Sequence, residues 1–238
     1  MKIQKVIFDL DNTLLDTEKF KIYIDSFLIS DFGLSVEEAK EVYVAARDQS
    51  NKVVFSQELL KEKLKDKLFS LKREFDEGRF DQRLQSINWK AYLLPGAIDI
   101  VECCQQRGVG IALLSLGYSK WQLYKVENSG LGGYFNAVRG NLILTSQPGE
   151  GKVEALKKFL GQGCIDGDGI VVVNDKPDET FLIMQEFKKI IALLREEIKD
   201  DRYRGEIFDG IRDEFQNRIF VSDRLDVLQI ELEKLLSR

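Results

Sequence analysis

The 238 residues, 44% of them hydrophobic, suffice for one large domain or for a core with a smaller companion. A net charge of -5 argues against a broad nucleic-acid surface, since clustered Lys and Arg bind phosphate backbones. The absence of histidine excludes Ser-His-Asp and Cys-His nucleophiles and His-ligated zinc or iron.

The rest of the composition indicates a cytoplasmic protein. No window approaches the roughly 20 apolar residues of a spanning helix, so no membrane association is expected. Cys103, Cys104 and Cys164 form no C-x-x-C pair and make a poor disulfide framework, which favours a reducing compartment. Small molecules or proteins are the expected partners, and the oligomeric state stays open.

Short apolar runs, most of them rich in β-branched residues, recur along the chain. They cover residues 5–8, 110–114, 169–173, 190–194 and 219–221. Runs without polar alternation are typical of strands buried on both faces, and helical stretches lie between them. We therefore predict an α/β fold, Rossmann-like and doubly wound, with a mostly parallel sheet and helices on both faces.

Residues 17–92 interrupt the alternation of strands and helices, because their apolar residues recur only with the spacing of helices. Ser35 and Glu38 have the spacing of a capping box that opens one helix, and Asp81 is a candidate cap for a later one. An apolar stripe marks the helix between them, formed by Leu60, Leu64, Leu68, Leu71 and Phe75. We expect an all-α insert at 17–92 and a core made of 1–16 and 93–238.

The later stretches of the chain are less uniform. Pro95 and Gly96 punctuate the return to the sheet and precede a predicted helix at 97–106. Residues 196–217 are polar and are expected to form a loop with one short helix. Arg47, Gln49, Asn51 and Lys52 close a predicted helix, where a solvated helix end is a simpler interpretation than contact with a substrate.

Polar groups follow three of the apolar runs, at the edge of a parallel sheet where reactive side chains gather. VIFDLDNTLLDT places Asp9 and Asp11 after the first run, ALLSLG places Ser115 after the second, and VVVNDKPDE places Asp175 after the third. Lys152 precedes a predicted helix at 153–160. The turn at the end of the first strand is expected to bring Asp9 and Asp11 toward one pocket.

These residue types suit phosphoryl transfer without histidine. A carboxylate attacks phosphorus, and a second carboxyl group protonates the departing oxygen and later activates water. Clustered acids would repel a phosphate dianion unless a cation intervenes, and oxygen ligands suit Mg²⁺. Lys152 would add a fixed positive charge, and Ser115 with nearby N–H groups would hydrogen-bond the phosphoryl group.

The ordered set resembles the motifs of the haloacid dehalogenase superfamily of hydrolases. VIFDLDNTLLDT is similar to its first motif, Asp-x-Asp-x-Thr after an apolar strand, and ALLSLG to its second. Lys152 stands at the third, and VVVNDKPDE is similar to the acidic fourth. SGLGGYFNAV and PGAIDIVECCQQRGVGIALLS resemble connecting segments of these enzymes, so the resemblance covers almost the whole chain.

The resemblance implies a role for each motif residue. Asp9 would be the nucleophile and Asp11 the general acid and base, while Mg²⁺ would be held by Asp9, the Asp11 carbonyl and Asp175. Phosphoryl oxygens would be bound by Ser115, Leu116, Gly117 and Lys152. The second acid of the fourth motif is either Asp178 or Glu179, and residues 17–92 would form an α-helical cap of the C1 type.

The favoured hypothesis is a Mg²⁺-dependent phosphatase that hydrolyses a small phosphorylated metabolite through an aspartyl-phosphate. The resemblance favours a phosphatase over a dehalogenase, because the dehalogenase branch does not carry an acid at position 11. Two alternatives stay open. One is a phosphomutase acting on a sugar phosphate, and the other is a non-catalytic binding protein that keeps the fold.

Overall fold

A computed structural model describes residues 2–48, 54–145, 151–161, 166–196, 201–204 and 206–237. Within these residues the core is a six-stranded, all-parallel sheet with strand order β5-β4-β1-β6-β7-β8. The strands are β1 (Lys5–Phe8), β4 (Gly110–Leu116), β5 (Leu142–Thr145), β6 (Ile170–Asn174), β7 (Ile191–Arg195) and β8 (Ile219–Ser222). The predicted fold class is confirmed. The sheet also contains β5, a half-buried edge strand of four residues that the sequence does not predict.

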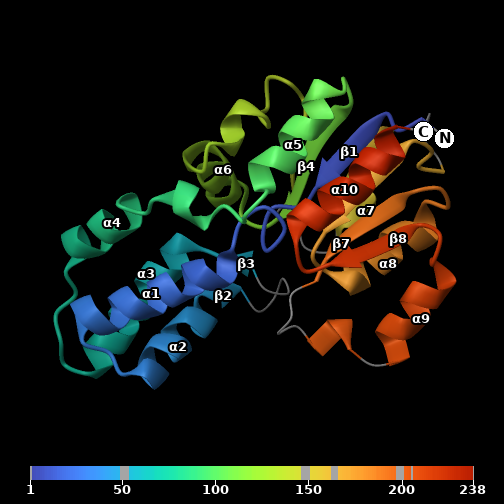
Figure 1. Ribbon diagram of the computed structural model, residues 1–238. Helices are drawn as coiled ribbons and strands as arrows, with labels where there is room; N and C mark the ends of the chain where they lie inside the picture. The colour runs from blue at the N-terminus through green and yellow to red at the C-terminus, as the bar shows by residue number, and fades with distance from the viewer. Residues whose placement is uncertain are drawn as a thin grey trace.

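Helices cover both faces of the sheet, as the two periods of the sequence predict (Figure 1). One face carries α5 (Ala97–Gln106), α6 (Ser119–Asn128) and α10 (Leu225–Leu236); the other carries α7 (Gly151–Leu160), α8 (Pro177–Glu186) and α9 (Glu206–Glu214). Successive strand side chains point to opposite faces, so Val6 and Phe8 enter one apolar cluster and Ile7 the other.

The order of the strands places β1 at the topological switch point of the sheet. The chain passes from β1 to β4 on one side and later returns to β6 on the other. Phe8 pairs with Leu113 of β4 and Val173 of β6, so the residues that follow these three strands meet at one edge. This edge is where open α/β sheets bind their ligands.

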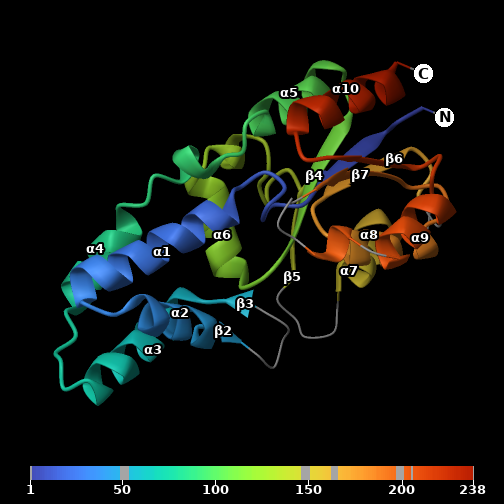
Figure 2. The ribbon, with the colours of Figure 1, turned by 60° about the horizontal axis from the view of Figure 1, so that its bottom comes forward.

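Four α-helices lie within residues 17–92, the segment that separates β1 from α5. They are α1 (Thr17–Phe32), α2 (Val36–Ala45), α3 (Gln57–Ser70) and α4 (Glu77–Gln85). Figures 1 and 2 show them gathered at one end of the molecule, beside the sheet, whereas both chain termini lie near the other end. We call residues 17–92 the helical insert.

The helix caps of the insert follow local rules, with one exception to the predictions. Ser35 and Glu38 form the expected capping box at the start of α2. Asp76, not Asp81, caps α4, because its side chain accepts a hydrogen bond from the N–H of Arg79, whereas Asp81 lies inside the helix. Leu60, Leu64 and Leu68 of the predicted stripe form the buried face of α3, whereas Leu71 is its C-cap and Phe75 lies beyond the helix.

The insert differs from a purely helical one by a short antiparallel pair, β2 (Arg47–Asp48) and β3 (Val54–Phe55). Arg47 thus lies in a strand and not at a helix end. Two residues a side are too few to show the alternation that marks a strand in a sequence. Gln49, Asn51 and Lys52 lie outside the described residues.

The remaining predictions concern the core. Helix α5 has the predicted bounds, and its Cys103 and Cys104 are buried, unpaired packing residues, whereas Cys164 lies outside the described residues. Between 196 and 217 the described residues form η4 (Asp201–Tyr203) and α9, more helix than expected. No described helix has both the length and the apolarity needed to cross a membrane.

Aromatic rings join the helical insert to the core. Phe20 of α1 stacks on Trp89 of η2 (Trp89–Tyr92), with ring centroids 5.0 Å apart. Trp121 of α6 lies 5.3 Å from Trp89 and 5.7 Å from Phe55. Because these rings belong to one continuous cluster of buried side chains, the insert and one face of the sheet share a hydrophobic core.

Candidate active site

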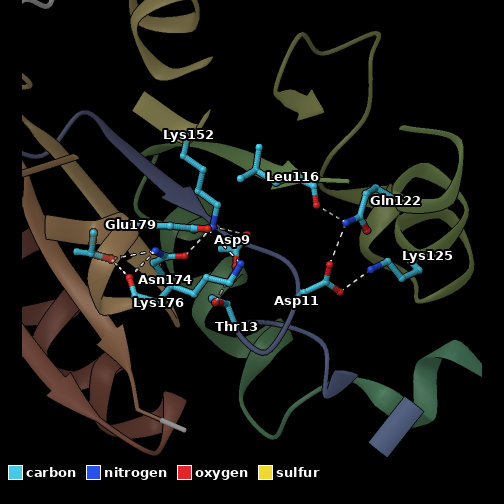
Figure 3. Close-up of polar contacts among 11 residues, drawn as sticks. Asp9, Asp11, Thr13, Leu116, Gln122, Lys125, Lys152, Asn174, Lys176 and Glu179 are labelled. Carbon is cyan, nitrogen blue, oxygen red and sulfur yellow. Dashed lines mark hydrogen bonds and ion pairs between the residues drawn. The ribbon is translucent and has the colours of Figure 1, made fainter. Parts of the chain in front are cut away.

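Asp9 directly follows β1, and its side chain is buried. The N–H of Asp9 donates to the carbonyl of Val173 at 2.9 Å, which continues the sheet by one residue. Its Oδ1 lies 2.9 Å from Nζ of Lys152, and the Thr13 hydroxyl is 3.4 Å from Oδ2 (Figure 3). The carboxylate is therefore held at the centre of the strand edge by a buried cation.

Lys152, near the start of α7, is the cation at the centre of the cluster. Its Nζ lies 2.8 Å from Oδ1 of Asn174 and 2.8 Å from Oε2 of Glu179, in addition to Asp9. Burial alone lowers the pKa of a lysine, but the Asp9 and Glu179 carboxylates outweigh it and hold the pKa of Lys152 above its usual value. The ammonium group is consequently charged at any physiological pH.

The structure distinguishes the two candidate acids of the fourth motif by position. Glu179 faces Lys152 from the first turn of α8, whereas Asp178 is exposed. Burial tends to raise the pKa of Glu179, but Lys152 and Lys176 lower it to about 2. Glu179, not Asp178, thus belongs to the buried cluster.

Asp175 is buried beside Asp9 and lacks a complete set of partners. Within the described residues its Oδ1 has no hydrogen-bond partner. Burial first, and then the negative charge of Asp9, raise the pKa of Asp175 well above its usual value. The Asp175 carbonyl is fixed by the hydroxyl of Tyr203. An under-coordinated carboxylate next to a second one is suited to a cation.

Lys176 is a site residue that the sequence analysis did not propose. Its Nζ lies 3.1 Å from Oε1 of Glu179, and Figure 3 shows its side chain extending toward Asp9. Burial lowers the pKa of Lys176, but Glu179, Asp9 and Asp175 raise it above the usual value. The strand edge therefore holds a second ammonium group close to Lys152.

Asp11 shares the strand end with Asp9 but makes its contacts in another direction. Its carboxylate faces α6, where Gln122 Nε2 donates to Oδ2 at 2.9 Å and Lys125 Nζ pairs with Oδ1 (Figure 3). Burial raises the pKa of Asp11, but Lys125 and Gln122 more than offset this and lower it below the usual value. In this arrangement Asp11 is ionised.

Gln122 links the first and second motifs. Besides its bond to Asp11, Nε2 donates to the carbonyl of Leu116 at 2.8 Å. Gly117 makes room for it: a Cβ atom there would lie 2.5 Å from Nε2 of Gln122, and the residue has a φ of 150°. The N–H of Gly117 donates to the Thr145 carbonyl at 3.0 Å, so the predicted contact of this N–H with phosphate is not available in this arrangement.

Ser115 lies where the second motif predicts, near the end of β4. It is buried, at 1% exposure, and β4 is the strand directly beside β1. Phe8 pairs with Leu113, so Ser115 lies two positions further, at the level of the turn that follows Asp9. The second motif therefore ends at the same edge as the first.

Sequence reasoning found the residues that directly follow strands and missed those that reach the site from elsewhere. Asp9 and Lys152 lie together, as the motifs predict, and Glu179, one of the two alternatives for the fourth motif, lies with them. Gln122 and Lys125 carry no local signal, because they are more than 100 residues from Asp11. Lys176 does carry a local signal in the sequence, because it directly follows Asp175 and must therefore lie at the same strand edge.

A cleft of about 660 Å³ lies between the insert and the core. Its walls are Ser56, Gln57, Glu58 and Leu59 from the insert and Tyr118, Ser119, Lys120, Trp121 and Tyr124 from the start of α6. The cleft therefore lies at the junction between the insert and the core, where the ring of Trp121 contacts Phe55 and Tyr124.

The family assignment rests on a sequence comparison. The sequence model of the haloacid dehalogenase-like hydrolases matches residues 6–177, which include the four motifs up to Pro177. The chain belongs to this family. Among curated proteins, none is similar enough in sequence to count as a match.

Solved structures with the family fold are similar to the chain over nearly its whole length. A haloacid dehalogenase-like hydrolase from Burkholderia xenovorans is 16% identical over 99% of each chain, with a TM-score of 0.66. A protein described as a β-phosphoglucomutase from Thermotoga maritima is 13% identical over 98% of this chain and 99% of that one, with a TM-score of 0.60.

A third similar structure has different chemistry. An L-2-haloacid dehalogenase from Xanthobacter autotrophicus, with chloropropionic acid covalently bound, is 15% identical over 97% of this chain and 98% of that one, with a TM-score of 0.56. At such low identities the three structures establish the fold, and the choice between family activities depends on the side chains of this chain.

Proposed function

We propose that the protein is a Mg²⁺-dependent phosphatase that hydrolyses a small phosphomonoester through an aspartyl-phosphate on Asp9. The observation that carries this proposal is the buried Asp9 carboxylate held 2.9 Å from a charged Lys152. A carboxylate in that position can attack phosphorus, and the lysine balances the charge that the phosphoryl oxygens bring in.

The proposed reaction has two steps. In the first, an Asp9 oxygen forms a bond to phosphorus, the bond to the ester oxygen breaks, and that oxygen takes a proton from Asp11. In the second, water attacks phosphorus and gives a proton to Asp11, which releases inorganic phosphate and restores Asp9. An acid at position 11 is the feature that favours a phosphatase over a dehalogenase.

Asp11 must change partners to act as an acid. Its contact with Lys125 favours the ionised form, so it has to leave Lys125 and Gln122 and gain a proton before it can protonate a leaving oxygen. A substrate that occupies the space between Asp9 and α6 would provide the competing contact. The arrangement described here corresponds, in this proposal, to the resting enzyme.

The residues present fit a magnesium ion. The side chains of Asp9 and Asp175 and the carbonyl of Asp11 are all oxygen donors, and Oδ1 of Asp175 is a buried acceptor whose partner is missing among the described residues. No three Asp, Glu or Cys side chains within the described ranges gather as a ready-made metal cluster, so two carboxylates would carry the ion. When bound, Mg²⁺ would neutralise phosphoryl charge.

We further propose that the helical insert is the cap of this enzyme. Its cleft with the core is lined from both sides, and Trp121 of that cleft is followed directly by Gln122, which holds Asp11. Closure of the insert would exclude water and bring selectivity for the substrate.

A panel of phosphomonoesters tests the proposal, with inorganic phosphate as the measured product. Turnover should require Mg²⁺, stop with EDTA, and fall below detection in Asp9→Asn. Turnover that persists in Asp9→Asn or in EDTA would contradict the mechanism. Return of the phosphoryl group to a sugar, without release of phosphate, would identify a mutase instead.

A further inference from the structure

Lys176 occupies an unusual place for a cation. It directly follows Asp175, its ammonium group pairs with Glu179 at 3.1 Å, and its side chain extends toward Asp9 (Figure 3). Its backbone is fixed as well, because its carbonyl accepts hydrogen bonds from Asn174 Nδ2 at 3.2 Å and from the Thr180 hydroxyl at 2.8 Å. The backbone of Lys176 is therefore held beside the acids.

The charges of the site are already nearly balanced by the protein itself. Four carboxylates face three ammonium groups: Asp9, Asp11, Asp175 and Glu179 against Lys125, Lys152 and Lys176. Lys125 is occupied by Asp11 and Lys152 by Asp9. Lys176 pairs with Glu179, and it and Lys152 are the two cations whose charge acts on the under-coordinated Asp175.

We propose that the Lys176 ammonium group competes with Mg²⁺ for the acids Asp9 and Asp175. The inference rests on the metal site of the proposed function. The ammonium group pairs with Glu179 and acts on Asp9 and Asp175 through its charge, so a second cation bound by those two acids would be repelled by it, and in a partly buried site this repulsion is screened less than in water. Mg²⁺ must therefore displace the ammonium group, and Lys176 lowers the affinity of the site for metal.

The side chain has a place to go when it is displaced. Lysine has a flexible four-carbon stem, and the Lys176 side chain is 37% exposed at the rim of the site. Glu179 would keep it tethered beside the cluster. Lys176 thus acts as a built-in counterion that offsets part of the negative charge of the acids without metal and sets the Mg²⁺ concentration at which metal replaces it.

The test measures Mg²⁺ binding by calorimetry, without any substrate, for the whole chain and for Lys176→Met. Met keeps the length of the side chain and removes its charge, so Mg²⁺ should bind roughly tenfold more tightly or better. Lys157→Met is the matched control, because Lys157 pairs with Glu154 and Glu186 on the surface, at 3.0 and 2.9 Å, and should leave Mg²⁺ binding unchanged. Adding Asp175→Asn to Lys176→Met should abolish the gain.

The possible results separate the inference from the function on which it rests. Equal or weaker Mg²⁺ binding by Lys176→Met would overturn the competition alone and leave the phosphatase intact. Loss of inorganic phosphate binding in that variant, with unchanged Mg²⁺ affinity, would overturn it too, because Lys176 would then be a phosphate ligand. Failure of every variant to bind Mg²⁺ would overturn both the competition and the proposed metal.

Discussion

Glu179 shows how a single buried acid links the site to stability. Its pKa is about 2, against an ordinary value of 4.5, because Lys152 and Lys176 stabilise the ionised form. A lowered pKa contributes stability that is present above pH 4.5 and is lost as the pH falls toward 2.

Replacing Glu179 should therefore weaken the fold at neutral pH. Glu179→Gln should lower the free energy of unfolding at neutral pH by about 3 kcal/mol and flatten its pH dependence below pH 4.5. Urea unfolding at a series of pH values measures both effects. Glu186→Gln, at the exposed end of the same helix, is the control, and an equal loss in the two variants would contradict the explanation.

Lys125 makes a prediction about catalysis. Lys125→Met removes the charge that favours ionised Asp11, so the pKa of Asp11 should rise. If Asp11 is the acid, the alkaline limb of the kcat/KM profile, which reports the free enzyme in which Lys125 contacts Asp11, should move to higher pH, and Lys125→Arg should restore the original profile. A reduced kcat with an unmoved profile would mean that Lys125 only supports the structure.

At the scale of single residues, the sequence predicts the position of those site residues that lie at or shortly after the end of a strand. Asp9, Ser115, Asp175 and Glu179 lie near or shortly after strand ends, so the topology of a parallel sheet brings them to one edge. The direction of the Asp11 side chain was beyond sequence reasoning. It depends on α6, whose contact with Asp11 exists only in the folded chain.

At the scale of elements, the junction between β4 and α6 depends on one glycine. Gly117 has a φ of 150°, and a Cβ atom at this position would lie 2.5 Å from Nε2 of Gln122. Gln122 holds both the Leu116 carbonyl and Asp11, so the glycine indirectly controls the position of the acid.

Gly117→Ala should cost about 1–3 kcal/mol of stability and displace Gln122 from Asp11. Thermal unfolding measures the first effect and the steady-state rate the second. Gly133→Ala is a suitable control, because nothing lies within 4 Å of the Cβ atom it would add. Identical behaviour of the two variants would show that Gly117 is dispensable.

The elements themselves were predictable wherever they are long or buried. The expected capping box of α2 and the three leucines of the expected stripe that lie in α3 are present, because each is a local feature of a single helix. The strand pair of β2 and β3 and the edge strand β5 were not predicted, because two to four residues are too few to show the alternation or apolar run that marks a strand. Such short strands form because they pair with a neighbouring strand, and this pairing cannot be read from the sequence.

At the scale of the whole molecule, the insert and the sheet share one apolar cluster, and Trp89 lies inside it with 1% exposure. Trp89→Ala should lower the free energy of unfolding by about 3–5 kcal/mol, because it leaves a cavity between Phe20 and Trp121. Denaturant unfolding measures the loss. A change below 1 kcal/mol would show that the ring is not part of a shared core.

The aromatic junction also has an optical consequence. The chain has only two tryptophans, and both belong to this junction, with ring centroids 5.3 Å apart. Trp89 belongs to the insert and Trp121 to α6 at the edge of the cleft. Tryptophan emission from the unlabelled protein therefore originates at the one place where the insert would shift on the proposed closure, with no other indole to obscure the signal.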